Sequence, residues 1–223
     1  MNSKENQIIE SLRDQVKEQL SGEGTGHDWF HVERVWKVAK AIADKETEAD
    51  LFVVAAGALL HDIADHKFHG GDETVGPKVA REILDKANLF PEKANKIVRI
   101  VEEISFKGAG VPTPMSSLEG KIVQDADRLD AIGAIGIART FAYGGSKNRP
   151  IYDPNIKPVC HTSFAAYKTS TAPTINHFYE KLLLLKEKMN TKAGKQMADK
   201  RHEFMEDFLT RFYMEWEGRD LEE

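Results

Sequence analysis

Residues 51–62 read LFVVAAGALLHD, a run of ten apolar residues followed directly by a histidine and an aspartate. The apolar run is about half as long as the ~20 residues that a membrane-spanning helix needs. Because its apolar side chains would face every side of a helix, the run predicts a helix buried in the middle of a bundle. The polar pair at its end then requires an explanation of its own.

The segments around this run have helical periodicity as well. Val32, Val35 and Ala39 recur at steps of three and four residues, and Asp28 is suited to cap the start of that helix. No stretch alternates between apolar and polar residues for long, so strands are not expected. The sequence therefore predicts an all-α helical bundle. Further helices are expected over residues 8–20, 75–87, 92–105, 117–129 and 131–142, at Phe178 to Leu185, and at Phe204 to Trp216.

Composition and charge exclude several classes of protein. The chain has 223 residues, with 31 Lys and Arg against 36 Asp and Glu, which gives a net charge of −5. This balance argues against a protein that binds nucleic acid polymers by neutralising phosphates. A single cysteine, Cys160, excludes an internal disulfide bond and a thiolate metal site. No apolar signal segment opens the chain and no apolar run could span a membrane, so the expected compartment is the cytoplasm.

We expect one domain over residues 1–223, with a motif-bearing core at about 26–140 and a C-terminal helical extension at about 159–217. A loop rich in glycine and proline, residues 144–158, is the best candidate boundary between the two parts. The last helix is rich in aromatic residues, which either seal the core or form the interface of a homodimer. Periodicity does not separate these alternatives.

Three polar clusters interrupt the apolar pattern. His27 and His31 lie one helical turn apart, His61 and Asp62 end the buried helix, and residues 124–130 read QDADRLD. A buried ionised carboxylate is costly unless it is paired. A divalent metal meets this need, since neutral imidazole and carboxylate are natural ligands. The alternatives are a hydrogen-bonded His–Asp pair at a helix end and a solvated acidic face.

The motifs HVERV at 31–35, HD at 61–62 and ADRL at 126–129 resemble those of the HD-domain phosphohydrolases, a metal-dependent superfamily with an all-α fold. The resemblance implies four metal ligands: His31, His61, Asp62 and Asp127. Asp125 is the nearest competitor for the last position. Residues 26–35, 61–65, 125–133 and 176–182 are also similar to a narrower branch, the small bacterial HD-type nucleotide pyrophosphohydrolases.

This branch implies hydrolysis of a nucleoside triphosphate to a monophosphate and pyrophosphate. The alternatives are a nucleoside monophosphatase (5′-nucleotidase), a non-catalytic HD domain that senses a nucleotide, and a purely structural metal site. Many HD phosphodiesterases bind a second metal through two further histidines, but none occurs here between His69 and His161. One divalent ion is therefore expected: Mn, Fe, Co, Ni or Zn, with Mg as a further candidate.

The remaining candidate residues serve catalysis and the phosphate chain. On a continuing helix Asp65 shares a face with His61 and Asp62, and the resemblance implies that it is catalytic. Its alternative role is that of an ordinary carboxylate at a helix end. Lys67, Lys147 and Arg149 are candidate phosphate contacts, although such side chains are commonly only solubilising. His27 is expected to donate to a phosphate or to brace the metal ligands.

Overall fold

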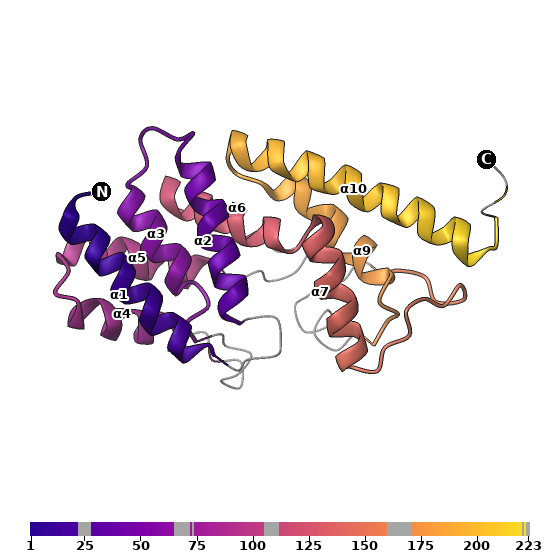
Figure 1. The fold of residues 1–223 in the computed structure, drawn as a ribbon, viewed down its shortest axis with the longest axis horizontal. Helices are drawn as coiled ribbons and strands as arrows, with labels where there is room; N and C mark the ends of the chain where they lie inside the picture. Colours follow the sequence, from indigo (N-terminus) through magenta and orange to yellow (C-terminus); the bar gives the residue numbers. More distant parts are fainter. Residues whose placement is uncertain are drawn as a thin grey trace. The chain divides into compact units, whose positions relative to one another are not determined.

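The computed structural model describes residues 1–21, 28–64, 72, 74–104, 112–159, 171–219 and 221. These residues form nine α-helices and one 3₁₀ helix without a strand, which confirms the all-α prediction (Figure 1). None of the helices described is both long and apolar enough to cross a membrane. The chain divides into two compact units, residues 1–107 with 111–127 and residues 108–110 with 128–223. The single HD-type domain expected over the whole chain stays a prediction.

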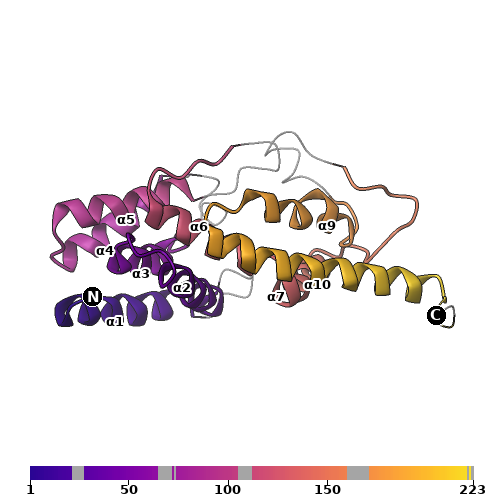
Figure 2. The ribbon, with the colours of Figure 1, turned by 90° about the horizontal axis from the view of Figure 1, so that it is seen from above.

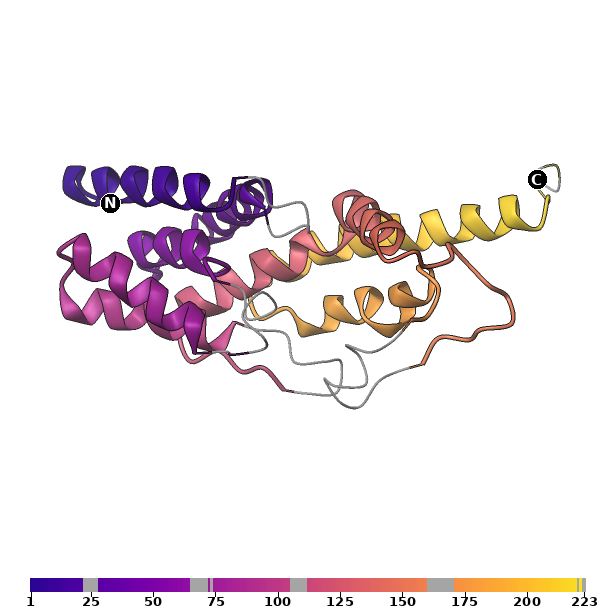
Figure 3. The ribbon, with the colours of Figure 1, turned by 90° about the horizontal axis from the view of Figure 1, so that it is seen from below.

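In the first unit, three helices surround a central one. The central helix is α3, on which α1, α2 and α5 pack, while α4 lies beside α5 (Figures 1 and 3). The helices are α1 (Ser3–Gln19), α2 (Trp29–Ala43), α3 (Leu51–Leu60), α4 (Val75–Lys86), α5 (Pro91–Glu103) and, up to residue 127, α6 (Leu118–Asp130).

The central position of α3 follows from its sequence. Nine of its ten residues are buried. Asp50 caps its start, because the Oδ1 atom accepts hydrogen bonds from the backbone N–H groups of Phe52 at 3.0 Å and Val53 at 3.4 Å. At Gly57 a Cβ atom would lie 3.1 Å from Cδ1 of Ile100, so the missing side chain lets α5 approach closely. The predicted buried helix is confirmed.

A cluster of charges fixes the beginning of α3. The Nζ atom of Lys93 lies 2.7 Å from Oε1 of Glu5 and 2.9 Å from Oδ2 of Asp50. The hydrogen bond from Lys93 is the main reason that the pKa of Glu5 is lowered. Burial alone would raise the pKa of Asp50, but hydrogen bonds from Lys93 and from the backbone outweigh it and lower the pKa. One ammonium group thus ties together the first turns of α1 and α5 and the cap of α3.

The second unit is built around the long helix α10 (Lys192–Trp216). This helix packs on α7 (Gly133–Ser146) and on the 3₁₀ helix η2 (Leu182–Lys188), which also contacts the short α9 (Asn176–Glu180) (Figure 2). Aromatic rings fill the space between the helices. The ring of Phe178 stacks on that of Phe208 at 5.8 Å and lies 6.1 Å from that of Phe141.

Two local predictions in this unit were wrong. The loop expected from Gly144 onward begins later, because α7 continues through Gly144 and Gly145 to Ser146. Gly144 is buried where a Cβ atom would lie 2.2 Å from Oγ1 of Thr174, so close packing overrides the low helix propensity of glycine. The single helix expected around Phe178 is instead split into α9 and η2. The chain breaks at Lys181, whose φ is −145° and ψ is −57°.

Candidate metal centre

The first turn of α2 holds His31. The Oδ1 atom of Asp28 accepts a hydrogen bond of 2.9 Å from the backbone N–H of His31, which confirms Asp28 as the predicted cap. Val32 and Val35 are fully buried on the same helix and fix which face of α2 points inward. The imidazole of His31 is therefore carried into the interior of the first unit, where only 1% of the residue is exposed.

His61 follows the last residue of α3 and keeps a helical backbone, with φ −57° and ψ −32°. Its Nδ1 atom lies 2.8 Å from the backbone carbonyl oxygen of Ala58. Because a carbonyl oxygen only accepts hydrogen bonds, Nδ1 is the donor, and Nε2 is the nitrogen that can offer a lone pair to a metal. This is the arrangement in which metal-binding histidines are usually held.

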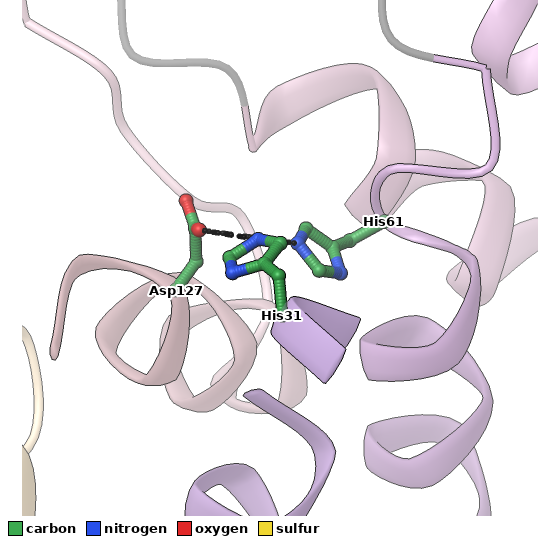
Figure 4. Close-up of side chains that lie close together, drawn as sticks. All are labelled: His31, His61 and Asp127. Atoms are coloured by element: carbon green, nitrogen blue, oxygen red, sulfur yellow. Dashed lines mark hydrogen bonds and ion pairs between the residues drawn. The ribbon is translucent and has the colours of Figure 1, made fainter. Parts of the chain in front are cut away.

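The two imidazoles meet a carboxylate from α6. Figure 4 shows the side chains of His31, His61 and Asp127 pointing toward one another. The two Nε2 atoms are 3.2 Å apart. The Oδ1 atom of Asp127 lies 3.5 Å from Nε2 of His31 and 3.9 Å from Nε2 of His61. One ligand atom from each of the three residues lies within 4.8 Å of the others.

Asp62 adds a second carboxylate. Its Oδ2 atom lies 3.3 Å from Nε2 of His31 and 3.7 Å from Nε2 of His61. The side chains of Asp62 and Asp127 are 16% and 33% exposed, whereas those of the two histidines are 1% exposed. The site therefore has a buried imidazole side and a carboxylate side that is open to solvent.

The structure separates Asp127 from its competitor Asp125. Both lie on α6, but residues two apart on a helix point about 200° away from each other, so only one of them can face His31. Asp125 is completely buried, and among the residues that the structure describes it is not part of the group of ligand atoms around His31. Of the two aspartates, Asp127 is therefore the one whose carboxylate lies beside the two histidines.

The geometry of His31, His61 and Asp127 fits one divalent ion, and the carboxylate of Asp62 lies beside the nitrogen atoms of both histidines. Ligand atoms about 2.1 Å from an ion lie about 3.0 Å apart at adjacent corners of an octahedron and about 3.4 Å apart in a tetrahedron. The distances between the nitrogen atoms and from them to the carboxylate oxygens, 3.2–3.9 Å, need only a small contraction to match. Two imidazoles in the donor set favour a transition metal over magnesium or calcium.

The structure does not test the other predicted site residues. His27, Asp65 and Lys67 lie outside the described residues. Lys147 and Arg149 belong to the second unit, where Nζ of Lys147 and Cζ of Arg149 lie 5.7 and 5.5 Å from the ring centroid of Tyr143. Their contact with substrate phosphates stays a prediction.

Sequence reasoning missed the backbone acceptor for His61. The carbonyl group of Ala58 carries no sequence signal, because every residue has one. The only clue is its spacing, since a residue three positions before a histidine at a helix end lies on the same face.

The chain is similar to proteins of known sequence and structure. The family model for the HD domain matches residues 29–132, which contain His31, His61, Asp62 and Asp127. The chain is 39% identical to "Uncharacterized protein YpgQ" of Bacillus subtilis (strain 168), over 98% of both proteins. The chain belongs to the HD-domain superfamily.

The chain is also similar to solved structures, one of them of an HD-superfamily hydrolase. An HD-superfamily hydrolase from Bacillus thuringiensis is 41% identical with a TM-score of 0.75, covering 96% of this chain and 98% of that protein. Bacillus subtilis YpgQ, solved in complex with ADP, is 34% identical in the structural alignment with a TM-score of 0.73, covering 95% of this chain and all of that one. The HD-domain resemblance predicted from the motifs is thereby confirmed.

Proposed function

We propose that this HD-domain protein is a divalent-metal-dependent phosphohydrolase that cleaves a nucleoside triphosphate to a nucleoside monophosphate and pyrophosphate. The proposal is carried by the meeting of two imidazole nitrogens 3.2 Å apart with carboxylate oxygens at 3.3–3.9 Å. Such a mixed nitrogen and oxygen donor set is typical of hydrolytic metal sites. The nucleotide class is supported by the similar YpgQ, whose structure was solved in complex with ADP.

The histidines and the aspartates of the centre contribute differently to the proposed reaction. A bound divalent ion would supply Lewis acidity to a water molecule and to a phosphate oxygen. His31 and His61 hold imidazole nitrogens inside the unit, whereas Asp62 and Asp127 form the side open to solvent, from which a substrate can enter. The two carboxylates also place two negative charges next to the imidazoles, and these charges stabilise a cation there.

In the proposed reaction, the oxygen of water bonds to the α-phosphorus and the bond from this phosphorus to the bridging oxygen breaks. Pyrophosphate leaves with that oxygen and its electron pair, and the carboxylate of Asp65, outside the described residues, accepts the proton of the water. Because the net charge of the chain is −5, an anionic substrate needs local cations. Lys67, Lys147, Arg149 and His27 are the proposed phosphate contacts.

The test combines elemental analysis of the purified protein with a panel of ribo- and deoxyribonucleoside tri- and monophosphates. We expect one transition-metal ion per chain, and equal amounts of monophosphate and pyrophosphate by ion chromatography. Release of orthophosphate from a monophosphate would instead identify a 5′-nucleotidase. Nucleotide binding without any turnover would identify a sensor.

Asp65→Asn sharpens this test. The variant keeps the shape of the side chain but loses the proton acceptor, so we expect normal nucleotide binding with turnover reduced at least about 100-fold. Asp14→Asn is the matched control, because Asp14 is an exposed carboxylate on α1 and the same change there should leave turnover intact. Equal turnover by both variants would refute the role of Asp65.

A further inference from the structure

A side chain from α1 contacts the turn that carries His61 and Asp62. The Nε2 atom of Gln19, the last residue of α1, donates a hydrogen bond of 3.2 Å to the backbone carbonyl of Ile63. Ile63 directly follows Asp62, and its own side chain is buried. Gln19 lies 44 residues away in sequence and outside residues 29–132 that match the HD domain.

Packing fixes where Gln19 presents its amide. Ile9, Leu12, Val16 and Leu20 form a buried stripe along α1, and this helix packs on α3. The position of the end of α1 is therefore determined by apolar contacts, not by the amide itself. Although Gln19 is an exposed residue, its amide nitrogen is carried to a defined place beside the turn.

The same turn is bounded on another side by α4. A Cβ atom on Gly76 would lie 3.3 Å from the backbone carbonyl oxygen of Ala64, so a side chain at this position would crowd that carbonyl. Within the turn, the N–H of Ile63 donates to the carbonyl of Leu60 at 3.1 Å. Residues 60–64 are thus held by contacts from α1 and from α4.

Asp62 depends on this turn more than His61 does. His61 is tied to α3 through Ala58, whereas Asp62 lies beyond the helix end, where the regular ladder of backbone hydrogen bonds stops. The direction of its carboxylate therefore follows the path of residues 60–64. Metal ligands need to be held within about 0.5 Å of their working positions.

We propose that Gln19 is a positioning residue for the metal centre: its amide holds the turn at residues 60–64 so that the carboxylate of Asp62 faces Nε2 of His31. This inference rests on the proposed function, in which these side chains bind a divalent ion. It assigns α1, outside the matched HD-domain region, a part in shaping the site.

Two substitutions in the full-length chain test the inference. Gln19→Glu keeps the shape but replaces the donor with an oxygen that repels the carbonyl of Ile63. Gln19→Met keeps the length, removes the donor and adds no charge at the C-terminal end of α1, where a negative charge is unfavourable. Gln15→Glu is the matched control, because Gln15 is an exposed glutamine one turn earlier on the same helix.

The readouts are the affinity for Co²⁺ by calorimetry and the visible absorption spectrum of the Co²⁺ form, which reports the geometry of the ligands. We expect Gln19→Glu to bind Co²⁺ about 3- to 10-fold more weakly with an altered spectrum, and Gln19→Met to show a smaller change of the same kind. This is less than the roughly 10- to 100-fold loss typical of a group that contacts a ligand directly, because Gln19 acts through the backbone. Gln15→Glu should match the wild type.

Wild-type affinity and an unchanged spectrum in both Gln19 variants would overturn the positioning role. So would a loss of affinity with the wild-type spectrum, accompanied by an equal loss of stability in urea, because that pattern indicates general destabilisation. Failure of the proposed function is seen separately, in the wild type. If the unmodified protein does not bind Co²⁺, the metal centre itself is refuted, whatever the variants do.

Discussion

The two compact units of this protein both shield histidines from solvent, fully in the first unit and partly in the second, but in opposite electrostatic surroundings. In the first unit, His31 and His61 face each other and the carboxylates of Asp62 and Asp127. In the second, burial and, after it, the positive charges of Lys181 and Arg149 lower the pKa of His177 to about 3. The positive neighbours of His177 oppose a further cation, whereas the carboxylates beside His31 and His61 supply the negative charge that a cation site needs.

Replacing one histidine in each unit tests whether the carboxylate neighbours decide which histidines bind a metal. In His61→Asn the amide can still donate to the carbonyl of Ala58, but the lone pair of Nε2 is lost. We expect metal affinity to fall at least about 100-fold and turnover to disappear.

His177→Asn is the counterpart in the second unit, and its metal content after dialysis should equal that of the wild type. Elemental analysis of the two purified variants gives the answer. Equal metal loss in both would mean that the carboxylate neighbours do not distinguish the two kinds of histidine.

A smaller effect comes from acid. Because the pKa of His177 is about 3 in the folded chain and near 6.5 in the unfolded chain, the unfolded state takes up the proton first as the pH falls. The contribution of His177 to the free energy of unfolding is therefore fully present above pH 6.5 and becomes smaller as the pH falls below this value. Between pH 7 and pH 5 the free energy of unfolding of the second unit should fall by about 2 kcal/mol from this group.

Urea unfolding of the wild type and of His177→Asn at a series of pH values measures this contribution. Between pH 7 and pH 5, the free energy of unfolding of His177→Asn should fall by about 2 kcal/mol less than that of the wild type. Parallel curves for the two proteins would show that His177 is not held neutral by its surroundings.

The smallest expected effect concerns two neighbouring glycines in α7. Gly144→Ala places a methyl group against Thr174, where a Cβ atom would lie 2.2 Å from Oγ1, and should cost about 1–2 kcal/mol of stability. Gly145→Ala meets nothing within 4 Å and should stabilise the unit by a few tenths of a kcal/mol through helix propensity. Opposite shifts of the urea midpoint are the expected result. Two shifts of the same sign would mean that contact with Thr174 does not decide the tolerance of position 144.

The first unit was the more predictable one from sequence. A run of ten apolar residues allows only a buried position for α3, and Asp28 offers a side chain suited to cap α2. The polar residues at the end of α3 stand out because burying them without partners is costly. These features depend on residue type and on spacing along one helix.

The features that sequence reasoning missed depend on contacts between distant segments. Helix α7 continues past Gly144 because Thr174, thirty positions later, occupies the space of a side chain. The choice between Asp125 and Asp127 required the rotation of α6 relative to α2, and periodicity does not give that rotation. The break at Lys181 has no glycine or proline to announce it.

The acceptor for Nδ1 of His61 belongs to the peptide backbone of α3, not to a side chain. Any amino acid at position 58 supplies the same oxygen, so no point mutation there can delete it. The tautomer of His61 changes only when the last turn of the helix unwinds. A cation bound at His61 would therefore protect the end of α3 against fraying.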